Sequence, residues 1–239
     1  MEIQSIGIVG AGQMGNGIAH VMALAGYDVL MTDVSAEALQ NALELVNANM
    51  SRQAGRGKIT EAEKDQALAR MKTTQTLTDL GQSDLIIEAA TERETVKQAI
   101  FEDLLPVLKP TTILTSNTSS ISITRLASRT DRPERFMGFH FMNPVPVMQL
   151  VELIRGIATN EETFAACKAV VDRLGKTAAS AEDFDADDQR GRLYTIRRRR
   201  EREIHRQFDE AGCQSSNGSA GAGGFHRAGH LSCHHERAA

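Results

Sequence analysis

One short stretch of this 239-residue chain constrains the fold more than any other. It consists of an apolar run at residues 6–9, then Gly10, Gly12 and Gly15 in G-x-G-x-x-G spacing, then apolar residues at helical intervals up to Gly26. A short continuous apolar run suits a buried parallel strand, and a glycine commonly ends a helix. A strand, a tight turn and a helix in this order predict the start of a parallel α/β sheet.

The three glycines have separate tasks if the turn binds a dinucleotide. Gly10 permits the tight turn, Gly12 lets the backbone approach a pyrophosphate, and Gly15 lets the helix lie close to the sheet. The first helical amides would then face the phosphates, and Gln13 and Met14 lie in the same turn. Because glycine-rich turns are common, the alternative is a strand–turn–helix unit that binds nothing.

Asp33 supplies the second half of the dinucleotide prediction. It follows a second apolar run at residues 29–31 and lies 18 residues beyond Gly15. A carboxylate there can accept hydrogen bonds from the ribose diol of adenosine and would repel a 2′-phosphate. The next residue, Val34, offers no positive charge to a phosphate. The sequence therefore predicts NAD rather than NADP as cofactor.

Further strands and helices alternate up to about residue 174, which predicts an α/β fold with a doubly wound, mostly parallel sheet of the Rossmann type. Apolar runs indicate strands at residues 85–90, 113–115, 136–141 and 149–154. Helical patterns are found at residues 35–50, 60–71, 94–107, 119–128 and 160–174, the last with Asn160 or Thr159 as its cap. We expect the first two of these helices to form an inserted helical hairpin.

The composition changes sharply near residue 184. From there on, the chain has ten arginines, no lysine and five of the seven histidines, but only four Leu, Ile, Val or Met residues. Such a segment cannot bury enough apolar area to offset the entropy of ordering it. We therefore expect a folded domain over residues 1–184 and a disordered or poorly packed tail over residues 185–239.

Two polar groups of residues follow predicted strands in the first part. Residues 116–120 read Ser-Asn-Thr-Ser-Ser, and ligands of open α/β sheets bind beyond the carboxyl ends of strands, where this cluster would lie. His140 lies near the end of an apolar run, and Glu152 stands twelve residues further on. A carboxylate can fix the tautomer of a histidine that acts as a general acid and base. The alternative is a structural histidine and a surface glutamate.

These motifs together resemble the NAD-binding domain of the short-chain L-3-hydroxyacyl-CoA dehydrogenases, and most of all the bacterial 3-hydroxybutyryl-CoA dehydrogenases. The resemblance covers about residues 3–184 and rests on four segments, GIVGAGQMGNGIA, LIIEAATE, SNTSSISIT and GFHFMNPVPVMQLVE. It implies an NAD-dependent enzyme that oxidises 3-hydroxyacyl-CoA, in particular 3-hydroxybutyryl-CoA, to 3-oxoacyl-CoA or catalyses the reverse reduction.

The resemblance assigns roles to individual residues. His140 would take the proton from the substrate hydroxyl, Glu152 would pair with His140, and Ser119 would hydrogen-bond near the 3-oxygen and the nicotinamide. Besides Asp33 and the glycine turn, the residues that would line the cofactor are Glu92, Lys97 and Asn143. The residues of the helical hairpin that would meet CoA phosphates are Arg52, Arg56 and Lys58, although a solvated basic face explains them equally well.

The resemblance ends at Phe184. The family continues with Pro-x-Phe-x-x-Asn-Arg, whose asparagine helps hold the substrate, and then with a helical domain that closes the acyl site and forms most of a homodimer interface. In this chain Asp-Ala-Asp-Asp-Gln-Arg follows Phe184, and Arg190 falls near the place of the asparagine. The role of that asparagine is therefore not carried over, and the dimer interface domain is expected to be missing.

Our hypothesis for the change is a shift of the reading frame. Residues 187–190 can be encoded so that the frame one base later reads Met-Ile-Asn-Glu, which the family has at the start of its helical domain. Residues 210–218 can be encoded so that the shifted frame gives Lys-Leu-Gly-Ala-Asn-His-Pro-Met, part of another stretch of the family. We expect an enzyme impaired by the loss of this domain or, alternatively, a catalytically inactive NAD-binding fragment.

Other classes of function fit less well. The formal net charge of −4 argues against a general nucleic-acid binder, although residues 197–200 are all arginine. The tail residues with metal-ligand chemistry are His226, His230, Cys233, His234 and His235, but a zinc site needs a fold that holds four ligands, and no metal is expected. No apolar run reaches the roughly 18 residues of a membrane span, the N-terminus has no basic region, and three cysteines form no disulfide framework. We expect a cytoplasmic protein that binds neither membranes nor nucleic acids.

Overall fold

The β-strands of this computed structural model, which describes residues 2–182, all belong to one sheet. The strands are β1 (Ser5–Val9), β2 (Asp28–Thr32), β3 (Met71–Thr74), β4 (Leu85–Glu88), β5 (Ile113–Ser116), β6 (Phe136–Phe141), β7 (Leu150–Arg155) and β8 (Thr177–Glu182). Their order across the sheet is β3-β2-β1-β4-β5-β6-β7-β8. All neighbours are parallel except β6 and β7, which are antiparallel. The winding of the chain therefore reverses between β1 and β4.

The described range contains six α-helices, several of which begin at a side-chain cap. They are α1 (Gln13–Leu24), α2 (Ala36–Gly55), α3 (Glu61–Ala69), α4 (Glu94–Leu104), α5 (Ile123–Ala127) and α6 (Glu161–Arg173). The side chain of Ser35 accepts a hydrogen bond from the Ala38 amide, and Asn160 caps α6 in the same way. Thr60 and Glu63 bond reciprocally in a capping box before α3. Each of these caps satisfies helical amides that have no carbonyl partner within the helix.

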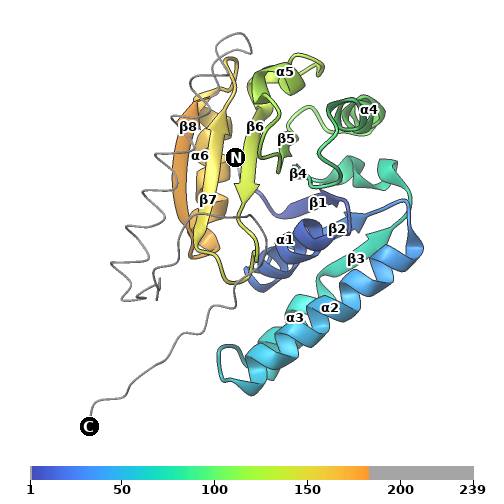
Figure 1. Ribbon diagram of the computed structural model, residues 1–239, viewed down its shortest axis with the longest axis vertical. Helices are drawn as coiled ribbons and strands as arrows, with labels where there is room; N and C mark the ends of the chain where they lie inside the picture. Colours follow the sequence, from blue (N-terminus) through green and yellow to red (C-terminus); the bar gives the residue numbers. More distant parts are fainter. Residues whose placement is uncertain (1, 183–239) are drawn as a thin grey trace, which may run out of the picture. The chain divides into compact units, whose positions relative to one another are not determined.

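Helices cover both faces of the sheet, and two separate hydrophobic clusters show this. Ile6 and Ile8 of β1 belong to a cluster that includes buried residues of α1, α2 and α6. Val9 belongs to a second cluster with Phe101 of α4 and Leu126 of α5. Successive strand residues point to opposite faces, so one apolar strand supplies both clusters. Figure 1 shows the helices on the two sides of the sheet and the hairpin of α2 and α3 beside β3. The predicted doubly wound fold is confirmed.

Several predicted boundaries need correction. The strands β3 and β8 were not expected, and α2 runs to Gly55 rather than to residue 50. The helix predicted at residues 94–107 ends at Leu104, and a 3-10 turn with Pro106 follows it. The helix predicted at residues 119–128 shrinks to α5, because the amides of Ser119 and Ser120 donate to a side chain instead of joining a helix. The predictions for residues 183–239 lie outside the described residues.

Asp84 ties three strands together at the amino ends of β1, β4 and β5. Its carboxylate accepts hydrogen bonds from the amides of Gln4 and Ser5 at 3.0 and 2.9 Å, and from the Lys109 ammonium at 2.5 Å. Burial alone would raise the pKa of Asp84, but these donors outweigh it and lower the pKa to about 2 from an ordinary 3.8. The ionised carboxylate is therefore favoured by folding.

This carboxylate should make the stability of the fold depend on acid. Because the pKa is lower in the folded chain, the contribution is present above about pH 4 and is lost as the pH falls towards 2. Asp84→Asn should lower the free energy of unfolding at neutral pH by about 1–2 kcal/mol, a value reduced for the partial exposure of the group. Urea unfolding at about pH 7 and about pH 3 measures both effects. Asp172→Asn, on the exposed face of α6, is the control, and an equal loss in both variants would contradict the prediction.

Candidate active site

The turn between β1 and α1 has the geometry that the three glycines predict. Gly10 has a φ of +104°, which a side chain would strain. A Cβ on Gly15 would lie 1.8 Å from the carbonyl oxygen of Gly10, so the helix approaches the turn too closely for any other residue. A Cβ on Gly12 would meet nothing within 4 Å, and no side chain caps α1. Open space therefore adjoins helical amides without an intrahelical partner, a combination that suits a phosphate.

Asp33 lies next to this turn, at the carboxyl end of β2. One carboxylate oxygen accepts a hydrogen bond from the Ala11 amide at 2.8 Å, and the other accepts one from the Ser35 amide at 3.0 Å. The following side chain, Val34, is 93% exposed. The structure thus orients the carboxylate beside the glycine turn, as a ribose contact requires.

A cleft of about 330 Å³ opens at the carboxyl ends of β4, β5 and β6. Six residues expected from the sequence line it, namely Met14, Glu92, Lys97, Ser119, His140 and Asn143. The other residues of its wall are Ala89, Ala90, Asn117, Phe141 and Met142. The sheet order places this cleft next to the reversal between β1 and β4, which is where open α/β sheets bind their ligands.

His140 and Glu152 face each other across the only antiparallel pair of neighbouring strands among residues 2–182. The distance from His140 Nδ1 to Glu152 Oε2 is 2.7 Å, and Glu152 is only 2% exposed. Because an ionised carboxylate can only accept, Nδ1 carries the proton of this bond. The remaining ring nitrogen, Nε2, is then the one that can exchange a proton with a molecule in the cleft.

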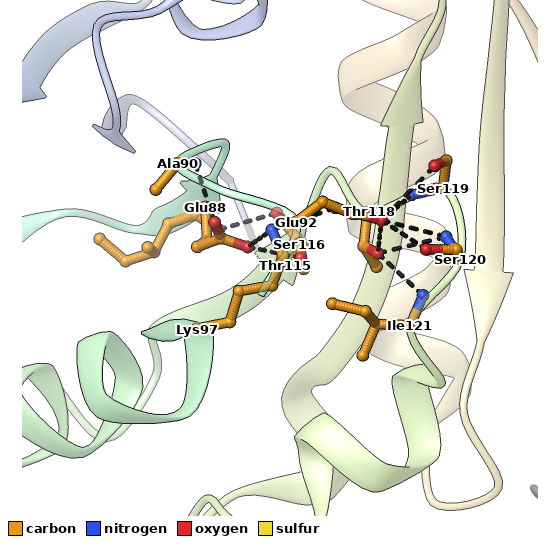
Figure 2. A network of polar contacts seen from close by, with 11 residues as sticks. Glu88, Ala90, Glu92, Lys97, Thr115, Ser116, Thr118, Ser119, Ser120 and Ile121 are labelled. Atoms are coloured by element: carbon orange, nitrogen blue, oxygen red, sulfur yellow. Dashed lines mark hydrogen bonds and ion pairs between the residues drawn. The ribbon is translucent and has the colours of Figure 1, made fainter. Parts of the chain in front are cut away.

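Glu92 holds the loop that carries Ser119. Its Oε1 accepts hydrogen bonds from the Thr118 hydroxyl at 2.5 Å, from the Ser119 amide at 3.0 Å and from the Ser120 hydroxyl at 2.9 Å (Figure 2). Burial would raise the pKa of Glu92, but these donors and the nearby Lys97 ammonium outweigh it and leave the pKa below its ordinary value. Glu92 is therefore both a wall of the cleft and the anchor of the Ser119 loop.

Lys97 lines the cleft, but its ammonium is bound by a carboxylate that the sequence analysis missed. Glu88, at the end of β4, accepts from Lys97 Nζ at 2.6 Å, and both side chains are fully or almost fully buried. The Ser116 hydroxyl and the Ala90 amide also donate to Glu88, at 2.6 and 2.8 Å (Figure 2). Lys97 lies 3.7 Å from Glu92, so one ammonium joins two carboxylates. The available signal was the position of Glu88, a polar residue that ends an apolar strand.

Asn117 is a second wall residue that the sequence analysis did not single out. The side-chain oxygen of Asn117 accepts a hydrogen bond from the backbone amide of Phe141 at 2.8 Å. The backbone amide of Asn117 donates to the backbone carbonyl of Glu88. It therefore ties together the ends of β4, β5 and β6.

The basic residues of the helical hairpin do not reach this cleft. Arg52, Arg56 and Lys58 are exposed at the end of α2 and in the turn after it, and the side chain of Arg52 bonds to Asn49. None of the three lines the cleft. Their proposed contact with CoA phosphates depends on the substrate extending to the hairpin.

The described residues 2–182 contain neither a candidate metal site nor a candidate membrane span. No cluster of three or more His, Cys, Asp or Glu side chains in this range is arranged to hold a metal ion. No helix of the described range is long and apolar enough to cross a membrane. The histidines, Cys233 and the arginine run of the tail lie outside it.

Comparison with known proteins points to one family. The family described as 3-hydroxyacyl-CoA dehydrogenase, NAD binding domain, matches residues 5–184. A 3-hydroxybutyryl-CoA dehydrogenase of Bradyrhizobium diazoefficiens is 57% identical over 184 residues, which are 77% of this chain and 63% of that protein. A probable 3-hydroxybutyryl-CoA dehydrogenase of Bacillus subtilis is 47% identical over 77% of this chain and 64% of its own length.

A solved structure agrees with these relatives. The (S)-3-hydroxybutyryl-CoA dehydrogenase of Ralstonia eutropha superposes with a TM-score of 0.75 at 46% sequence identity. The match covers 77% of this chain and 65% of that one. The chain thus spans less than two thirds of the length of each of these three proteins.

Proposed function

This chain belongs to the 3-hydroxyacyl-CoA dehydrogenase family, whose NAD-binding domain it matches over residues 5–184, and we propose on that premise that it interconverts 3-hydroxyacyl-CoA and 3-oxoacyl-CoA. The observation that carries the proposal is the bond from Glu152 to His140, because His140 lines the same cleft as Ser119. We propose 3-hydroxybutyryl-CoA as the substrate, because relatives that carry this name share 57% and 47% identity with the chain.

The cofactor is NAD, and the residues present fit it. Helical amides at the glycine turn would bind the pyrophosphate, and the open space at Gly12 lets the phosphates approach them. Asp33 would bind the ribose of the adenosine half. The other half would then extend past Met14 into the cleft, towards His140 and Asn143. When bound there, NAD supplies the acceptor or donor of the hydride.

His140 would act as the general base of the oxidation. Its Nε2 accepts the proton of the substrate 3-hydroxyl, while the carboxylate of Glu152 stabilises the imidazolium that forms. The Ser119 hydroxyl donates a hydrogen bond to the 3-oxygen and fixes its position relative to the nicotinamide. In the reverse reduction His140 returns the proton. Arg52, Arg56 and Lys58 are proposed to contact the phosphates of CoA.

The proposal is tested by turnover. Acetoacetyl-CoA and NADH are incubated with the 239-residue chain, and the loss of NADH absorbance is followed together with the formation of 3-hydroxybutyryl-CoA. NADH binding without turnover would favour the second candidate, a catalytically inactive NAD-binding fragment. The absence of both binding and turnover would contradict the family-based proposal.

A single substitution tests the cofactor assignment. Asp33→Asn keeps an acceptor for the Ala11 amide but removes the charge that would bind the ribose. It should weaken NAD binding by about 1–3 kcal/mol, the range of a hydrogen bond to a charged group. Isothermal titration calorimetry measures the Kd, with Asp131→Asn at an exposed position as the control. Unchanged NAD affinity in Asp33→Asn would show that the ribose lies elsewhere.

The proposal includes the origin of the tail. We infer that residues 1–184 are the NAD-binding domain and that residues 185–239 are read in a shifted frame, which leaves turnover impaired. The loss of oriented positioning alone lowers a rate by several powers of ten. Resequencing the gene around the codon for Phe184 tests the shift directly. An alternative frame that does not encode Met-Ile-Asn-Glu there, or turnover as fast as that of a frame-restored chain, would overturn it.

A further inference from the structure

The loop of residues 142–149 joins β6 to β7 and therefore links the two strands that carry His140 and Glu152. Met142 and Asn143, at its start, line the cleft. The amides of Val147 and Met148 both donate to the Pro144 carbonyl at 3.0 Å and close a turn. The shape of this turn sets where the first residues of the loop lie in the cleft.

Lys176 binds this loop from a distant part of the chain. It stands just before β8, and its Nζ donates to the carbonyl oxygens of Val145 and Met148 at 2.8 and 2.6 Å. The amide of the next residue, Thr177, donates to the Gln149 carbonyl at 2.8 Å. Lys176 is partly buried, and this burial lowers its pKa. An ammonium that donates to two carbonyls forms charge-assisted bonds and restrains the loop at two points.

The restrained loop also packs against α1, the helix that follows the glycine turn. Val145 is 2% exposed, and a Cβ added to Gly17 of α1 would lie 3.0 Å from its Cβ. No space is left for the loop to move towards α1. The ammonium of Lys176 therefore holds Val145 against the helix whose first turn would face the phosphates, while Asn143 stays at the cleft.

We propose that Lys176 is a positioning residue for the nicotinamide half of the cofactor site. This inference rests on the proposed function, because it takes the cleft as the place of that half. The adenosine half would be held by Asp33 and the glycine turn, whereas the Lys176 ammonium donates to the Val145 and Met148 carbonyls of the 142–149 loop. The loss of the Lys176 ammonium should thus affect the two halves of NAD unequally.

Two ligands distinguish the nicotinamide half of the cofactor site from the adenosine half. ADP-ribose contains the adenosine, the pyrophosphate and the second ribose but no nicotinamide ring, whereas NADH contains all of them. Lys176→Met should weaken NADH binding about 10-fold and ADP-ribose binding less than about twofold, because the lost charge-assisted bonds act on the loop beside the nicotinamide. Lys176→Arg, which can donate to both carbonyls, should bind NADH like the unaltered chain. Lys168→Met, at an exposed position of α6, is the control for loss of a lysine charge.

Each outcome of the calorimetric titrations decides the matter. If Lys176→Met binds NADH and ADP-ribose equally more weakly and also unfolds at a lower urea concentration, Lys176 is only structural and the inference is overturned. Unchanged binding of both ligands by Lys176→Met would also overturn it. If the unaltered chain binds neither ligand, the proposed function fails first and the inference falls with it. Should Lys176→Met not fold, Lys176→Gln, which keeps a neutral amide donor group but removes the charge, takes its place.

Discussion

Replacing His140 with alanine should lower kcat for the reduction of acetoacetyl-CoA about 10²- to 10⁴-fold, the range of a lost general acid or base. The chain used has its reading frame restored after Phe184, so that the rate is high enough for a loss to be measured. Nε2 of His140 is the ring atom left to transfer a proton, because Nδ1 is bound to Glu152 at 2.7 Å. Stopped-flow and steady-state measurements of NADH consumption give kcat, and fluorescence titration gives the Kd for NADH.

Two controls separate catalysis from folding. The Kd of His140→Ala for NADH should lie within about twofold of that of the unaltered chain, both with the restored frame and with the present tail. The reason is that none of the proposed contacts to charged groups of the cofactor involves the imidazole. Glu152→Gln keeps a hydrogen-bond acceptor for Nδ1 but removes the charge that stabilises the imidazolium, so it should lower kcat less than His140→Ala. A His140→Ala variant with unchanged kcat would remove the histidine from the mechanism.

Replacing Lys97 with methionine should lower the free energy of unfolding by about 3–5 kcal/mol, because it leaves the buried carboxylate of Glu88 without its counterion. Glu88 keeps the Ser116 hydroxyl and the Ala90 amide as donors, so the loss should fall towards the lower end of this range. Urea unfolding followed by circular dichroism measures it. Lys168→Met, which breaks an exposed pair with Asp172, should cost less than about 0.5 kcal/mol.

A double variant shows whether the pair itself or an isolated charge sets the stability. Glu88→Gln combined with Lys97→Met removes both charges from the interior and should regain most of the loss, since a buried pair is often no more stable than its neutral replacement. If the double variant is as unstable as Lys97→Met alone, the cost comes from the shape of the site and not from an unpaired charge. If Lys97→Met is no less stable than the unaltered chain, the buried pair has no structural role.

Buried parallel strands are predictable from this sequence, whereas the edge strands are not. The runs at β1, β4 and β6 are apolar because both of their faces are covered by helices. The edge strands β3, with the sequence MKTT, and β8, with TAASAE, have one strongly apolar residue between them. Pairing with β2 and β7 determines their structure, and such pairing leaves no periodic signal in a short polar segment.

The candidate site was predictable wherever a residue stands at the end of an apolar strand. Asp33, Ser119 and His140 follow this rule, and the structure places the last two in one cleft. Glu88 follows it as well, but a carboxylate that is completely buried is rare enough that sequence reasoning passed over it. The bonds of Glu88 to Lys97 and Ser116 depend on α4 and β5 packing against the end of β4, which no local pattern contains.

The position of Glu152 opposite His140 also has a consequence for how the site forms. The two residues are partners in the ladder between β6 and β7, so the hydrogen-bonded dyad is built by the same register that closes this part of the sheet. A slip of one residue would turn Glu152 to the other face and put Val151 or Leu153 beside the imidazole. A half-aligned dyad is therefore not an available state. Once these two strands have paired, the hydrogen-bonded pair that we propose for proton transfer is in place before any ligand binds.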